Sequence, residues 1–154
     1  MKNNIKIITF LSFLLIFICG CGKSENKMIC TIDESDGVIK NRYILNYDSD
    51  WEEIDNLVIE EIVDFSGVEN VEKFDCGKDI DECLQSAKGD YEVCKNNSMF
   101  SDCKIEDETK TGLKIIAKVD EKELKNEDNV FYVTNNTSKN KAKSILEDKG
   151  YKCE

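Results

Sequence analysis

Cysteine is the residue type with the clearest capacity for chemistry in this 154-residue sequence, which contains eight cysteines and no histidine. A thiol can form a disulfide, bind a metal ion, exchange electrons or carry a lipid. Cys19 and Cys21 stand one glycine apart at the end of an apolar run. The other six are Cys30, Cys76, Cys83, Cys94, Cys103 and Cys153. The chemistry open to these six depends on the compartment, which the first pair indicates.

The N-terminal segment has the features of an export signal. Lys2 and Lys6 give a positive segment before an apolar stretch at 7–18. This stretch is shorter than the roughly 20 residues of a membrane span and has the length that is typical of a signal peptide. The tetrapeptide Ile18-Cys19-Gly20-Cys21 resembles the bacterial lipobox, in which an aliphatic residue, a small residue and Gly or Ala precede the modified cysteine. The resemblance implies cleavage between Gly20 and Cys21 and a diacylglyceryl thioether on Cys21. The alternative is an ordinary secretory signal in which Cys21 is incidental.

This interpretation divides the chain into three parts. Residues 1–20 form a cleaved lipoprotein signal peptide, 21–27 contain the lipidated Cys21 and a flexible tether, and 28–154 form a single extracytoplasmic domain. Removal of the signal, which carries two lysines and no acidic residue, changes the formal net charge from −11 to −13. Such a charge repels phosphate backbones and argues against nucleic acid as a partner. We therefore expect a protein held at the outer side of the bacterial cell membrane by its lipid.

An even number of cysteines in an exported domain predicts three disulfides. A bond between Cys30 and Cys153 would tie the first strand to the tail, and one between Cys94 and Cys103 would join a helical segment to a hairpin. This leaves Cys76 with Cys83, a pair that cannot share one continuous helix because seven residues of helix rise about 10 Å. A zinc site is the competing interpretation, but the sequence has no C-x-x-C pair and no histidine to complete one. The sequence alone does not choose among the connectivities.

Acidic residues are the second group with chemical potential. They cluster at 48–53, 79–82 and 106–108. A calcium loop beginning at Asp48 would need Gly at its sixth position and Glu at its twelfth, where this sequence has Glu53 and Ile59. Two carboxylates could also hydrolyse a glycosidic bond, but none stands in an apolar context with a recognisable partner. We therefore interpret the clusters as solvated surface and expect no metal and no cofactor.

Aromatic residues offer a third possibility, a platform for carbohydrate. Tyr43 and Tyr47 fall on the apolar face of an alternating segment at 38–47. Packing in the core is the interpretation that this placement favours.

Alternating apolar residues predict strands at 28–32 and 38–47, joined by a turn that ends in Asp36-Gly37. The segment 51–65 fits a strand or a helix, and its β-branched residues favour a strand from about Ile54.

The second half contains helical and extended segments. Residues 68–97 read as helical pieces interrupted at Gly77 and Gly89, and 103–119 as a β-hairpin. A last short strand is expected at 130–133.

A final helix is expected after Thr137 or Ser138, with Lys149-Gly150 at its end. The sequence thus predicts an α+β fold. Its antiparallel sheet of about five to six strands, a meander plus a hairpin, packs with a central helical segment and a C-terminal helix.

The order of these segments resembles the YehR-like family of small bacterial lipoproteins. The resemblance is carried by Ile18-Cys19-Gly20-Cys21, by the meander that turns at Gly37, and by KIEDETKTGLKIIAKVDEKEL at 104–124. It implies a lipid-anchored protein of a family without an established activity, so only the role of Cys21 transfers. We expect a non-catalytic binding or interaction module whose partner is an envelope protein, a wall polymer or a cation. The alternative is a cell-surface hydrolase that uses paired carboxylates.

Overall fold

The computed structural model describes residues 26–154, so the lipobox residues Ile18, Cys19, Gly20 and Cys21 lie outside the described residues. The elements in chain order are β1 (Asn26–Glu34), η2 (Ser35–Gly37), β2 (Ile39–Tyr47), β3 (Ile54–Asp64), η3 (Glu72–Phe74), α2 (Ile80–Lys95), β4 (Phe100–Glu106), β5 (Gly112–Val119), α3 (Glu121–Leu124), α4 (Lys139–Asp148) and β6 (Lys152–Cys153).

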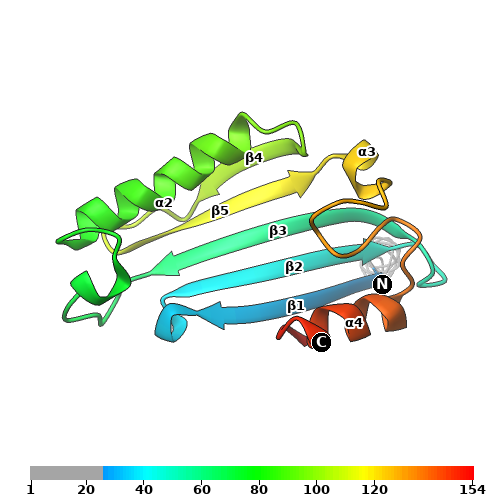
Figure 1. The fold of residues 1–154 in the computed structure, drawn as a ribbon, viewed down its shortest axis with the longest axis horizontal. Helices are drawn as coiled ribbons and strands as arrows, with labels where there is room; N and C mark the ends of the chain where they lie inside the picture. The colour runs from blue at the N-terminus through cyan, green and yellow to red at the C-terminus, as the bar shows by residue number, and fades with distance from the viewer. Residues whose placement is uncertain (1–25) are drawn as a thin grey trace, which may run out of the picture.

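The strands form one six-stranded sheet in the order β4-β5-β3-β2-β1-β6, and every neighbouring pair is antiparallel. β1, β2 and β3 make the expected meander, and the hairpin of β4 and β5 joins it through β5 (Figure 1). The predicted α+β fold is confirmed. The alternative at 51–65 is resolved as a strand, which begins at Ile54.

One face of the sheet carries both longer helices. One row of directly paired residues crosses five strands and consists of Cys30, Tyr43, Ile59, Ala117 and Cys103. Alternate residues along each strand share the face on which this row lies. We call it the inner face. α4 lies over it beside β1, while α2 lies over the opposite end beside β4 (Figure 1).

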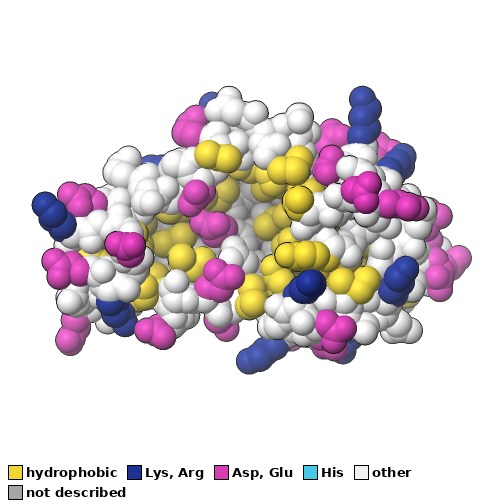
Figure 2. All heavy atoms as spheres, viewed as in Figure 1, with side chains coloured by type: hydrophobic (Ala, Val, Ile, Leu, Met, Phe, Trp, Pro, Cys, Tyr) yellow, Lys and Arg dark blue, Asp and Glu magenta, His cyan; other side chains and the backbone are white. Residues whose placement is uncertain are grey.

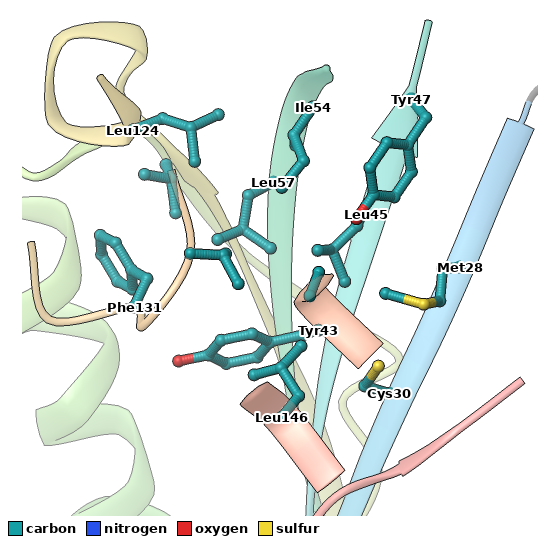
Figure 3. Close-up of a cluster of buried hydrophobic side chains, with 13 residues drawn as sticks. Met28, Cys30, Tyr43, Leu45, Tyr47, Ile54, Leu57, Leu124, Phe131 and Leu146 are labelled. Carbon is teal, nitrogen blue, oxygen red and sulfur yellow. The ribbon is translucent and has the colours of Figure 1, made fainter. Parts of the chain in front are cut away.

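The core under α4 is built from residues that are distant in sequence. Leu146 and Ala142 of α4 are fully buried against Met28, Leu45 and Leu57 of the sheet (Figure 3). Phe131 and Val133 complete this cluster from the loop before α4. The prediction of a strand at 130–133 is wrong. The segment that carries Phe131 and Val133 is irregular and pairs with no strand, although both side chains are buried.

A second core lies under α2. Cys83, Leu84 and Ala87 pack against Val63 and Leu113, and Asp79 caps the helix by accepting a hydrogen bond from the Glu82 amide at 2.9 Å.

The expected interruption at Gly89 is wrong, since α2 runs unbroken from Ile80 to Lys95. One exposed glycine costs a helix only about 1 kcal/mol relative to alanine, and the packing of the buried face exceeds that cost.

Three disulfides join the pairs Cys30–Cys153, Cys76–Cys83 and Cys94–Cys103. Cys76 lies before the first residue of α2 and Cys83 lies in its first turns. The two cysteines therefore do not share one continuous helix, as a disulfide between them requires. Cys30 and Cys153 also stand opposite each other where β1 pairs with β6.

Candidate functional site

The two helices leave a strip of the inner face uncovered between the two cores. Along β3, Leu57 at one end and Val63 at the other are buried, while Ile59 and Glu61 between them are only half-buried. Asn41 stands opposite Glu61 on β2 and is half-buried as well. Figure 2 shows a hollow with hydrophobic side chains on its floor between the two helix-covered ends. We call Asn41, Ile59 and Glu61 the central strip.

Glu61 gives this apolar floor a negative charge. Burial raises the pKa of its carboxyl group, and the nearby charges of Asp90 on α2 and Glu34 at the end of β1 raise that pKa further. No lysine or arginine among residues 26–154 lies within ion-pair distance of Glu61. Its neighbour Glu60 points to the opposite face, where it pairs with Arg42 at 3.5 Å. Among the described residues, Glu61 on the inner face therefore has no basic partner of the kind that Arg42 provides for Glu60 on the opposite face.

Tyrosines form the wall of the hollow on the side of α4. The rings of Tyr43 and Tyr151 are 5.1 Å apart, and burial together with the second phenol raises the pKa of Tyr43. Tyr132 is 51% exposed and has a positive φ of 68°, and it is near enough to contribute to the raised pKa of Tyr43. The Lys149 ammonium lies 4.9 Å from the centre of its ring. This wall offers aromatic surface and hydroxyl groups at the edge of the floor.

α2 supplies the opposite wall. Ala87 of α2 is buried against the sheet, and the next turn of the same side carries Asp90 and Tyr91. Tyr91 is half-buried against the second core. The hollow therefore has an apolar floor, aromatic groups on both sides and acidic groups at its centre and rim.

The residues singled out from the sequence mostly lie elsewhere. The six cysteines are joined in disulfides, and Cys21 lies outside the described residues. Tyr43 and Tyr47 are buried, as core packing predicts.

The acidic clusters also lie outside the hollow. Glu106 and Asp107 pair with Lys114 at 3.3 and 3.1 Å. Within residues 26–154, no group of three potential ligands is arranged to hold a metal ion.

Glu61 is the residue that sequence reasoning missed. A signal for it was present, because Leu57, Ile59, Glu61 and Val63 alternate on one face and the glutamate interrupts an otherwise apolar series. An acidic residue at a core-facing position predicts either a buried partner or an opening in the core. The structure has the opening.

In the part of the chain that the structure describes, no helix combines the length and the apolarity needed to cross a bilayer. No protein-family model matches this chain, and neither a curated protein nor a solved structure matches it.

Proposed function

We propose that this chain is a membrane-anchored extracytoplasmic lipoprotein that acts by binding a partner in the hollow over the central strip. Cleavage between Gly20 and Cys21 and lipidation of Cys21 provide the anchor. Two acyl chains, each contributing about 0.8 kcal/mol per buried CH₂, hold a protein stably on a membrane. The three disulfides support an oxidising compartment outside the cytoplasm.

The uncovered carboxylate of Glu61 on an apolar floor is the observation that carries the binding proposal. A half-buried charge without a counter-ion is costly, and a cationic group brought by a partner would remove that cost. The apolar floor and the tyrosine wall favour a partner that also brings apolar side chains. Among an envelope protein, a wall polymer and a cation, a protein segment with lysine or arginine beside apolar residues fits both features.

A titration with designed peptides tests this site. The mature chain carrying Cys21→Ser, which lacks the lipid, is mixed with decapeptides of alternating leucine and lysine and with counterparts of leucine and glutamate. We expect binding of the lysine series only. Glu61→Lys is expected to weaken it about tenfold or more, because a charge-assisted contact is lost and a repulsive one is introduced.

Glu92→Lys is the matched control. It makes the same change of charge on the exposed side of α2 and is expected to leave the affinity within about twofold, since an exposed charge is screened by salt. Equal binding of both peptide series, or equal effects of the two variants, would contradict the proposal.

Cell fractionation tests the anchor separately. Cys21→Ser is expected to move the protein from the membrane to the soluble fraction, whereas Cys19→Ser is expected to leave it in the membrane. An unchanged distribution of the Cys21 variant contradicts lipidation at this residue.

A hydrolase that uses paired carboxylates is the second candidate, and Glu61 is the observation that favours it. Burial and the carboxyl groups of Asp90 and Glu34 raise the pKa of Glu61, and glycosidases use one carboxyl group with a raised pKa as the general acid and a second carboxyl group as its partner. Release of soluble fragments from dye-labelled wall polysaccharide by the parent protein, abolished by Glu61→Gln, would establish this function and displace the binding proposal.

A further inference from the structure

The face of the sheet opposite to the helices differs in charge from the rest of the domain. We call it the outer face and define it by the strand residues that alternate with those of the inner face. Its aliphatic members are Ile29, Ile44, Val58, Ile62 and Ile116. Its basic members are Lys27, Lys40, Arg42, Lys104, Lys114, Lys118 and Lys152, and its acidic members are Asp33, Glu60, Asp64, Asp102 and Glu106.

Apart from Gly112, no strand residue of the outer face is buried, and no helix of residues 26–154 lies over this face. Ile29, Ile44 and Val58 stand opposite one another on three adjacent strands. Ile116 on β5 lies diagonal to Val58, and Ile62 on β3 lies diagonal to Ile116, so the five aliphatic side chains form a continuous half-exposed band.

The net charge of the outer face is opposite in sign to that of the remaining described residues. Seven basic against five acidic residues give the outer face a formal charge of +2. The other described residues include eleven basic and twenty-six acidic side chains, a formal charge of −15. Four of the basic groups pair with acidic groups, as Lys40 does with Asp33 at 3.6 Å. Lys27, Lys118 and Lys152 are left without such a partner among residues 26–154.

We propose that the outer face rests on the anionic lipid surface of the membrane that holds the anchor, with the hollow of the inner face turned away from it. The inference rests on the proposed lipidation of Cys21. Asn26 follows Cys21 by five positions in the sequence, so a fully extended tether keeps the start of β1 within roughly 17 Å of the lipid. The tether lets the domain approach the headgroups to within the screening length of about 8 Å, where they attract the unpaired lysines and repel the acidic remainder, and both effects turn the domain in the same direction.

Charge complementarity separates this occupant from a second copy of the chain. Two outer faces of the same sign repel each other, whereas an anionic bilayer attracts the three unpaired lysines. The aliphatic band is flat and half-exposed, which suits contact with the headgroup region.

The orientation can be measured with the native lipidated protein in nanodiscs that contain either phosphatidylcholine alone or a mixture with phosphatidylglycerol. A Trp51→Phe background removes the single tryptophan, and a reporter is then placed by Ile44→Trp on the outer face or by Val93→Trp on α2. Val93 is 66% exposed and lies on the helix-bearing side. In anionic discs, quenching by headgroup-labelled lipid is expected to be about threefold or more stronger for the reporter at 44 than at 93.

Two charge-reversed variants provide the matched comparison. The first changes Lys27, Lys118 and Lys152 to glutamate, and the second changes Lys95, Lys122 and Lys141, which are exposed and lie off the outer face. Both alter the net charge equally. Only the first is expected to equalise the two reporters, and 1 M salt is expected to do the same, because it shortens the screening length to about 3 Å.

Each other outcome overturns the proposal in a recognisable way. Equal quenching at 44 and 93 in protein that floats with the discs refutes the orientation and leaves the anchor intact. Protein that does not float with the discs refutes the anchor and therefore both proposals. A reporter at 44 that is shielded without lipid quenching, together with a doubled molecular mass, assigns the face to a second copy.

Discussion

Removal of the disulfide between Cys30 and Cys153 is expected to destabilise the domain more than removal of either other disulfide. Its cysteines are 123 residues apart, whereas Cys76 and Cys83 are seven apart. Loop-closure entropy grows with the logarithm of the closed length, which gives about 4.9 kcal/mol for the long loop and about 2.5 kcal/mol for the short one at 25 °C. The difference of about 2.4 kcal/mol between the two is the quantity to be tested.

Two double variants make the comparison clean. Cys30→Ala with Cys153→Ala opens the long loop, and Cys76→Ala with Cys83→Ala opens the short one, and neither leaves an unpaired thiol at the site. Cys30 and Cys83 are 0% and 2% exposed, so each variant also loses one buried sulfur, and that cost is similar in the two. The remaining difference reports the length of the loop.

Calorimetry and urea unfolding under non-reducing conditions measure the effect. The entropy of unfolding of residues 26–154 is about 0.27 kcal/mol/K, from about 2.1 cal/mol/K per residue. The melting temperature is therefore expected to fall by about 18 °C for the long loop and by about 9 °C for the short one. Equal losses in the two variants, or a larger loss for the short loop, would refute the reasoning from chain entropy.

Four further substitutions have expected outcomes. Glu61→Gln is expected to be more stable than the parent at pH 7 and equal to it well below pH 4. The reason is that the pKa of Glu61 is raised in the folded state, so the stability of the parent falls as the pH rises through that pKa. Urea unfolding at both pH values measures the difference, and a difference that persists in acid would contradict this reasoning. Gly89→Ala is expected to raise the free energy of unfolding by about 0.5–1 kcal/mol, because a methyl group there meets no atom within 4 Å. Gly112→Ala is expected to lower it by about 1–3 kcal/mol, since its Cβ would lie 2.5 Å from the Val63 carbonyl oxygen; thermal unfolding of both glycine variants should give opposite shifts. Leu146→Ala, at a fully buried site under α4, is expected to cost about 3 kcal/mol in urea unfolding, and a cost below about 1 kcal/mol would refute its place in the core.

Local pattern was sufficient for much of the sheet. Tyr43, Leu45 and Tyr47 recur at every second residue, while Lys40, Arg42 and Asn46 take the other face, and this period places the three on the buried face of β2. The turn at Asp36-Gly37 has the left-handed backbone that these two residue types tolerate, with φ values of 56° and 84°. Both features depend on neighbours in sequence, and for this reason the sequence alone predicts them.

Features that depend on distant residues were harder to predict. Phe131 and Val133 are buried because α4 and the sheet leave room for an irregular loop, and no local pattern distinguishes this from a strand. The hollow arises because α2 and α4 cover opposite ends of the inner face and leave the middle open. The sequence therefore shows that Glu61 interrupts an apolar series, but the partial exposure of its side chain depends on where α2 and α4 pack.

The pairing of β1 with β6 also has a mechanical consequence. Ile29 and Glu154 exchange two backbone hydrogen bonds, at 3.0 and 2.9 Å, next to the covalent link from residue 30 to residue 153. Tension applied between residues 26 and 154 passes directly through that link and bypasses the loop it closes. A pull of this kind can detach only residues 26–29 from β2 and residue 154 from β1, so the rest of the sheet and the helices α2 and α4 carry no load while the disulfide stays closed.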